Sequence, residues 1–269
     1  MDLNELQQKY SISNIDVEPV ETYRLQGYPV DFPVSGGTVN VLLGPPSVGK
    51  TSLALYLGIR EAMQKQRYVL YYTWDWASQF LGTRASAWIS TENLKKQDTF
   101  LFDDKGSVES LCSASKILPR GSMIIIDYLQ VFPISQLPAG FSNGVEGRCS
   151  FLSELIQRLA RRDGHMFFVL GAMNRESLKM KEEDQTLSSG YGTSKIEYSA
   201  DSVVIASRTG SMDTHTLELR TKKNRWGMTQ EICCFPFRVL EKNVVDKQED
   251  NTERETDSLL KVGGGIKYD

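Results

Sequence analysis

The chain has 269 residues, of which 40% are hydrophobic and 24% charged, and its formal net charge is −3. This length and composition are typical of one large α/β domain with a full core. The negative net charge excludes a global basic field that would draw the chain onto nucleic acid, but it leaves room for a local basic patch. No apolar run reaches the roughly 18 residues of a membrane span, and the N-terminus lacks a secretory signal. We therefore expect a cytoplasmic protein without a membrane partner.

The predicted elements alternate between strands and helices from residue 38 onward. Apolar or β-prone runs predict strands at residues 39–43, 68–73, 122–127, 166–170 and 202–206. Apolar residues at helical spacing predict helices that begin at residue 52 and that cover residues 78–89 and 147–162. Near-continuous apolar strands separated by helices indicate a parallel sheet with helices on both faces.

The pattern changes after residue 207. Two strands at residues 217–221 and 231–235 predict an antiparallel extension of the sheet. At the two ends of the chain, residues 1–33 are mixed and polar, with room for a short helix at residues 3–10, and residues 243–269 are charged, as in a disordered tail. The predicted organisation is an N-terminal segment, an α/β domain at residues 34–242, and that tail.

The segment GPPSVGKT at residues 44–51 matches G-x-x-x-x-G-K-[ST], the phosphate-binding loop of nucleoside triphosphatases. A predicted strand precedes the loop and a predicted helix follows it, as this chemistry requires. Glycines let the backbone N–H groups face the phosphates, and the helix N-terminus adds a favourable partial charge. The alternative is a glycine-rich turn before a helix. We predict an ATP site formed by Gly44, Pro45, Pro46, Ser47, Val48, Gly49, Lys50, Thr51 and Ser52.

A Mg²⁺ site is predicted beside this loop. The Thr51 hydroxyl is one expected ligand, and Lys50 is expected to reach the β- and γ-phosphates. Asp127 ends the predicted strand at residues 122–127, where a carboxylate could hold Mg²⁺ through water. The alternative for Asp127 is a strand-end residue that caps the next turn.

Four segments resemble DnaB-type replicative helicases, which belong to the RecA-like ATPases. IDYLQ at residues 126–130 is similar to the Walker B segment, and LGAMNR at 170–175 to L-S-Q-L-N-R. IEYSAD at residues 196–201 is similar to I-E-Q-D-A-D, and KKNRWG at 222–227 to K-x-R-x-G. The resemblance implies a RecA-like P-loop core with a mainly parallel, twisted sheet, helices on both faces and an antiparallel extension near the C-terminus.

The resemblance also implies a catalytic base. Asp75 stands where the family places a Glu that activates the attacking water, and its side chain is one carbon shorter. The alternative for Asp75 is a surface residue between packed tryptophans. Ala172 stands at the family's polar sensor position, where it has no side chain to couple the γ-phosphate to nucleic acid. The departure at residue 172 weakens the case for a fast, DNA-stimulated motor more than the case for nucleotide binding, whereas Asp75 is either a weak base or a base whose position the neighbouring backbone compensates.

Lys223 and Arg225 match the family's finger residues, which reach the γ-phosphate bound to the neighbouring subunit. On a strand, alternate positions share a face. A finger that acts in trans requires a homo-oligomer, either a ring or a helical filament, with nucleotide at the subunit interfaces. The alternative is a solvated basic hairpin.

Two long segments, at residues 132–147 and 176–195, follow strands at the edge where open α/β sheets bind ligands. In the family these positions line a nucleic-acid channel, so Lys179, Lys181 and Lys195 are candidate phosphate contacts. Binding to single-stranded DNA is expected to be weak because acidic residues oppose these lysines. The N-terminal segment or the tail could recruit a protein partner.

Three functions remain open from the sequence. The first is a Mg²⁺-dependent ATPase, a DnaB-like motor core with slow turnover that acts on or with single-stranded nucleic acid in replication or recombination. The second is an ATP-dependent assembly or regulatory switch without helicase activity, which Asp75, Ala172 and the negative net charge favour. A small-molecule kinase is the third, and it leaves Lys223 and Arg225 unexplained.

Overall fold

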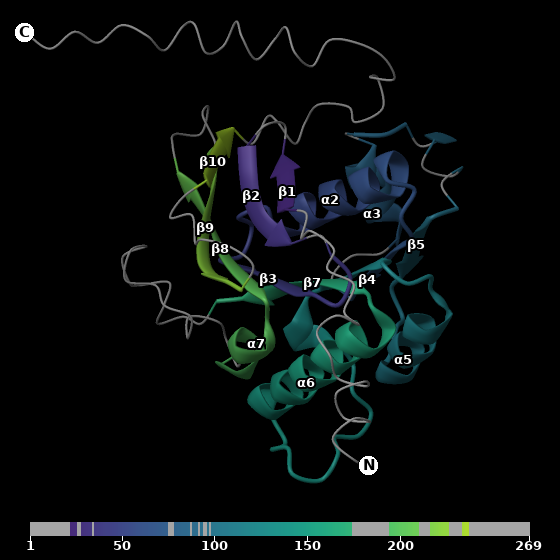
Figure 1. Cartoon of the computed structure of the whole chain (residues 1–269), viewed down its shortest axis with the longest axis vertical. Coiled ribbons are helices and arrows are strands. Elements are labelled where there is room, and N and C mark those ends of the chain that lie inside the picture. Colours follow the sequence, from purple (N-terminus) through teal and green to yellow (C-terminus); the bar gives the residue numbers. More distant parts are fainter. Residues whose placement is uncertain are drawn as a thin grey trace, which may run out of the picture.

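A computed structural model describes residues 22–25, 28–33, 35–74, 78–86, 88–90, 92–93, 96, 98–173, 194–209, 216–225 and 233–236. Within these residues the main sheet has eight strands in the order β10-β9-β8-β3-β7-β6-β4-β5. A smaller sheet pairs β1 (Thr22–Leu25) with β2 (Tyr28–Pro33). Figure 1 shows the main sheet running between two layers of helices.

The main sheet is parallel over most of its width. β3 pairs in parallel with β7 and β8, β6 with β7 and β4, and β4 with β5, whereas β9 is antiparallel to β8 and β10. The predicted mainly parallel sheet with an antiparallel extension is therefore confirmed. The strands of the main sheet are β3 (Val39–Gly44), β4 (Val69–Thr73), β5 (Phe100–Asp103), β6 (Met123–Asp127), β7 (Met166–Ala172), β8 (Ser202–Thr209), β9 (Thr216–Asn224) and β10 (Cys233–Pro236).

Helices cover both faces of the sheet, as the sequence predicts. α2 (Lys50–Gln64) and α3 (Ser78–Ala85) lie on one face, and α5 (Val108–Ile117), α6 (Val145–Asp163) and α7 (Ser194–Ser199) lie on the other (Figure 1). Successive strand residues point to opposite faces. Tyr71 accordingly belongs to the core under α2, and Tyr72 to the core under α6.

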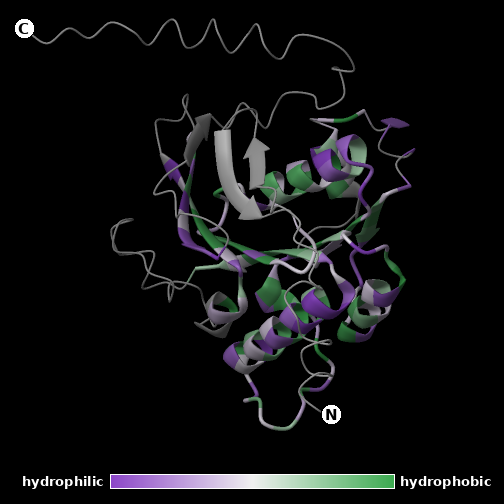
Figure 2. Ribbon diagram, viewed as in Figure 1, coloured by the Kyte–Doolittle hydropathy of each residue, from purple (hydrophilic) through white to green (hydrophobic). Residues whose placement is uncertain are grey.

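The local sequence explains where α5 begins and where α6 ends. Ser107 and Ser110 form a capping box at the start of α5. Gly164 ends α6 in the left-handed region, at φ 72°, where a residue without a Cβ is favoured. Figure 2 shows hydrophilic and hydrophobic residues mixed along α5 and α6, as expected for helices that bury one side against a sheet.

The register of the parallel strands brings several strand ends to one edge of the sheet. Gly44, the last residue of β3, pairs with Ala172 at the end of β7. Thr73, the last residue of β4, pairs with Asp127 at the end of β6. The phosphate-binding loop, Asp127 and Ala172 therefore meet at the carboxyl edge, where open α/β sheets bind ligands.

Some elements differ from the prediction. The helix predicted at residues 78–89 ends at Ala85, because the chain then turns to bury Trp88 and Ile89. β5 and α5 were not predicted. Residues 22–33, predicted as part of a polar segment, contain the β1–β2 hairpin, and β2 contacts β8, β9 and β10. The predicted helix at residues 3–10 and the tail at 243–269 lie outside the described residues.

None of the helices in the described part of the chain has the length and apolar character needed to cross a membrane.

Candidate functional site

The phosphate-binding loop has an unusual backbone between β3 and α2. Ser47 has φ 60° and Gly49 has φ 112°, and α2 begins directly afterwards at Lys50. Alternation between left- and right-handed residues can turn successive N–H groups toward one concave surface, which suits an anion. At Gly44 a Cβ would lie 2.7 Å from the Ala206 carbonyl oxygen, so the close approach of β8 requires glycine there.

A cavity of about 490 Å³ opens beside this loop. Its volume lies within the usual range for small-molecule sites, roughly 300–1,000 Å³. Three sources contribute its wall: the loop with the first turn of α2, the ends of β6 and β7, and α3. The lining residues are Pro46, Ser47, Gly49, Lys50, Thr51, Ser52, Arg84, Asp127, Tyr128 and Ala172. The cavity thus unites most of the predicted loop residues with Asp127, whereas Val48 is buried in the core.

Lys50 is held at the cavity wall by the loop itself. Its Nζ donates hydrogen bonds to the carbonyl oxygens of Gly44 and Pro45, both at 2.8 Å. These charge-assisted bonds join the first turn of α2 to the beginning of the loop. They also keep a positive charge beside the backbone that a phosphate would approach.

Asp127 is almost fully buried, with 3% of its surface exposed. The Tyr71 hydroxyl donates to Asp127 Oδ2 at 2.8 Å across the β4–β6 pair. Burial, and then the neighbouring Asp127 charge, raise the pKa of Tyr71, so the hydroxyl keeps its proton and remains a donor. This contact supplies a buried carboxylate with a partner that it needs.

Arg84 is a candidate binding residue that was not predicted. Its Nε and Nη2 atoms donate to Ser52 Oγ at 3.2 and 2.6 Å, which places a guanidinium from α3 beside the first turn of α2 at the cavity wall. A guanidinium can bind phosphate oxygens in a forked geometry. The helical pattern places Arg84 on a helix, but it does not indicate that this helix packs beside Ser52.

At the predicted sensor position, Ala172 presents its backbone rather than a polar side chain. The Gln130 side chain, which follows β6, accepts from the Ala172 N–H at 3.3 Å and donates to the Ala172 carbonyl at 3.4 Å. The side-chain amide at this position therefore comes from Gln130 and not from residue 172, and it joins the segment after β6 to the end of β7.

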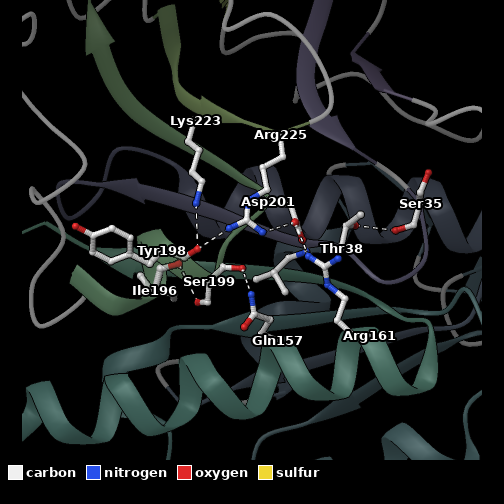
Figure 3. A network of polar contacts seen from close by, with 11 residues as sticks. Ser35, Thr38, Gln157, Arg161, Ile196, Tyr198, Ser199, Asp201, Lys223 and Arg225 are labelled. Atoms are coloured by element: carbon white, nitrogen blue, oxygen red, sulfur yellow. Dashed lines mark hydrogen bonds and ion pairs between the residues drawn. The ribbon is translucent and has the colours of Figure 1, made fainter. Parts of the chain in front are cut away.

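Lys223 and Arg225 contact a single carbonyl group. Lys223 Nζ and Arg225 Nη2 donate to the Tyr198 carbonyl at 3.2 and 2.9 Å (Figure 3). Arg225 Nη1 also donates to Oδ1 of the fully buried Asp201, at 3.3 Å. Neither residue lines the cavity beside the phosphate-binding loop.

Asp201 connects Arg225 to the rest of the fold. Its Oδ2 accepts from the Val39 N–H at 2.9 Å, and its Oδ1 accepts from Arg161 at 2.7 Å as well as from Arg225. Arg225 and Arg161 also line a second cavity of about 600 Å³, together with Glu154, Gln157 and Arg158. A buried carboxylate with several donors anchors the end of β9 beside α6 and the start of β3.

Asp75, Lys179 and Lys181 lie outside the described residues, and Lys195 is described only as part of the α7 backbone. In the predicted channel segment at residues 132–147, Phe132 is buried and its carbonyl accepts from Arg148, while α6 begins at Val145.

The residues at the first cavity fit a magnesium nucleotide. Thr51 and Asp127 offer the oxygen ligands that Mg²⁺ prefers. Lys50 and Arg84 supply positive charge for a polyphosphate, and Ser47 and Gly49, the loop residues with positive φ, line the same cavity.

Solved structures resemble this fold. A DnaB-like replicative helicase, described with its interactions with primase, matches with a TM-score of 0.67 and 16% identity over 89% of this chain and 65% of that chain. A solved ATPase domain matches with a TM-score of 0.61 and 16% identity, over 77% of this chain and 84% of that one. The RadB recombinase matches with a TM-score of 0.55 and 13% identity, over 78% and 92% of the two chains.

These likenesses concern the fold. The chain spans about two thirds of the replicative helicase, because the match covers 65% of that chain. No protein-family model matches the sequence, and no curated protein does. The chain has the RecA-like fold, and the predicted resemblance to the motor domain of DnaB-type helicases is confirmed at that level.

Lys50→Ala should reduce the affinity for MgATP by about a hundredfold or more, because a polyphosphate loses a charge-assisted partner. Isothermal titration calorimetry measures the affinity, and thermal unfolding reports whether the protein is folded. Lys65→Ala is the matched control, since Lys65 is exposed at the other end of α2. Equal affinity in Lys50→Ala and wild-type protein would show that the nucleotide does not bind at this loop.

Arg84→Ala should weaken MgADP binding about tenfold, because one charged hydrogen-bonding group is lost from the cavity wall. Arg84→Lys should recover only part of this affinity, since an ammonium lacks the forked geometry. Arg60→Ala on the exposed side of α2, where Arg60 contacts Gln64, is the control. If Arg84→Ala lowers the melting temperature but leaves the MgADP affinity unchanged, Arg84 only holds α3 against α2.

Proposed function

We propose that this chain is a Mg²⁺-dependent ATPase, the motor core of a DnaB-like assembly that acts with single-stranded nucleic acid. The observation that carries the proposal is the cavity lined jointly by Lys50, Thr51 and Asp127. Lys50 and Thr51 lie where the loop enters α2, and Asp127 ends β6. Binding of a triphosphate with Mg²⁺ requires this combination of residues. The RecA-like fold, shared with helicase and recombinase domains, is in keeping with this activity.

In the proposed site, the loop N–H groups and Lys50 bind the β- and γ-phosphates, and Arg84 approaches the polyphosphate from α3. Thr51 and Asp127 hold the Mg²⁺, which neutralises phosphate charge when it is bound. Asp75 comes two residues after Thr73, the last residue of β4, and Thr73 pairs with Asp127. We assign to Asp75 the role of the base that orients and deprotonates the attacking water.

The geometry around Asp201 supports a finger that acts on a neighbouring subunit. Asp201 bonds to the N–H of Val39, at the start of β3, whereas the phosphate-binding loop begins at Gly44, at its end. Five residue steps along a strand amount to about 16 Å. Arg225, held at Asp201, therefore lies near the opposite edge of the sheet from the cavity of its own protomer.

Release of Arg225 toward another subunit would leave Asp201 with other partners. The carboxylate keeps the Arg161 guanidinium and the Val39 N–H as donors, so no buried charge becomes unpaired. The Arg225 side chain is 43% exposed, and its departure disturbs little of the core. A homo-oligomer with nucleotide at the subunit interface follows from this assignment.

A slow, ATP-dependent assembly switch is the second candidate, and the Ala172 geometry favours it. Alanine at the sensor position has no polar side chain that could couple the γ-phosphate to a nucleic-acid loop. Its backbone N–H and carbonyl are already bonded to Gln130. The shorter carboxylate at Asp75 points in the same direction.

Turnover of ATP with and without single-stranded DNA tests the proposed function. We expect slow hydrolysis that requires Mg²⁺ and rises when an oligonucleotide is added at low salt. The stimulation should fall steeply as salt increases, because phosphate contacts release counterions. A hydrolysis rate that DNA does not change at any salt concentration would support the assembly switch. Transfer of phosphate to a small molecule instead of water would support a kinase.

Mixing two inactive variants tests whether the finger acts in trans. Arg225→Ala should keep MgATP binding but lose most of its turnover, since an arginine supplied to the transition state contributes about 10³-fold or more. Mixing it with Lys50→Ala protein should restore part of the activity, because some interfaces pair an intact Lys50 with an intact Arg225. Full turnover by diluted monomers, or no recovery on mixing, contradicts the arrangement in trans.

A further inference from the structure

We propose that Tyr71 is a positioning residue for the Mg²⁺ ligand Asp127, and that its hydroxyl sets the orientation in which the carboxylate receives the metal. The inference rests on the proposed function, because Asp127 is a metal ligand only if the cavity binds a magnesium nucleotide. Tyr71 does not line that cavity, so its effect passes through Asp127.

The β4–β6 register explains why a tyrosine can make this contact. Tyr71 pairs with Ile125, and Asp127 follows two residues later on the same face of β6. The long side chain of Tyr71 reaches along the neighbouring strand to Asp127 Oδ2, at 2.8 Å. A phenylalanine could fill the same space in the core but could not donate this hydrogen bond.

Packing fixes the ring that carries the hydroxyl. Tyr71 is 0% exposed and belongs to the core beneath α2. Its ring stacks on Phe102 at a centroid distance of 6.3 Å and lies 6.4 Å from Phe100. A donor that is held this firmly restricts the rotamer of its acceptor, so the Asp127 carboxylate is oriented before any metal binds.

The arrangement has the form of an outer-shell partner in a metal site. Carboxylates that bind metals are usually hydrogen-bonded in turn, and loss of such a partner typically costs about 10–100-fold in metal affinity or activity. Only 3% of the Asp127 surface is exposed and Tyr71 is fully buried, so water cannot readily replace the Tyr71 hydroxyl at Oδ2.

Tyr72 provides a matched control in the next position of the same strand. It is also buried, at 1% exposure, but it belongs to the opposite core, under α6. Its hydroxyl lies 3.4 Å from Ser110 Oγ and away from Asp127. Tyr72→Phe thus removes a buried tyrosine hydroxyl from β4 without touching the proposed metal ligand.

The experiment measures ADP affinity by calorimetry in Mg²⁺ and in EDTA for wild type, Tyr71→Phe and Tyr72→Phe. The affinity gain due to Mg²⁺ should fall about tenfold or more in Tyr71→Phe, while ADP binding in EDTA stays unchanged. Tyr72→Phe should keep the wild-type gain. Electron paramagnetic resonance of free Mn²⁺ measures metal binding in the presence of ADP without any turnover. Tyr71→Phe should bind Mn²⁺ more weakly by the same factor.

A double-variant cycle identifies the residue through which Tyr71 acts. In an Asp127→Ala background, Tyr71→Phe should have no further effect on the Mg²⁺-dependent gain. If Tyr71→Phe lowers the melting temperature but leaves the gain intact, or weakens ADP equally in Mg²⁺ and EDTA, Tyr71 only supports the core and the inference is wrong.

Failure of the proposed function gives a different result. If wild-type protein binds no ADP, or binds it without any gain from Mg²⁺, the nucleotide site itself is wrong and the role of Tyr71 falls with it. If the wild type shows the gain and Tyr71→Phe retains it, only the role of Tyr71 is rejected.

Discussion

Parallel pairing of β3 with β7 and of β4 with β6 brings the ends of these strands to one edge of the sheet. Gly44 lies beside Ala172, and Thr73 lies beside Asp127. A shift of β6 by one residue would turn Asp127 to the other face of the sheet and separate it from the loop. The buried apolar faces of β3 and β6 hold the register, so packing of the core determines the geometry of the cavity.

The same strand also relates the cavity to Arg225, the proposed finger residue. β3 ends in the phosphate-binding loop and begins at Val39, whose N–H is held by Asp201. One buried carboxylate thereby connects Arg225 to the amino end of the strand that carries the loop at its other end. Under the proposed function, nucleotide contacts within a protomer and finger contacts between protomers would use opposite ends of the β3 strand.

The sequence predicts the parts of this arrangement that depend on strong local patterns. The strands at residues 39–44, 123–127 and 166–172 are fully or almost fully buried, so they appear as continuous apolar runs. β5 was not predicted because it is a strand of only four residues at the edge of the sheet. Its residues are mostly half-buried, so no clear alternation of apolar and polar residues marks it. The phosphate-binding loop is recognisable because its chemistry needs contiguous residues. Arg84 and Tyr71 act across elements that are far apart in the chain, and only the packed structure brings them to Ser52 and Asp127.

A crystal structure of the chain with Mn²⁺ and a non-hydrolysable ATP analogue tests the central claim most directly. The anomalous signal of Mn²⁺ locates the metal independently of the nucleotide. The account predicts one strong peak within coordination or water-bridging distance of Thr51 Oγ1 and the Asp127 carboxylate, with the phosphates on the N–H groups of the loop. A nucleotide bound elsewhere, or a metal peak remote from both residues, would contradict it.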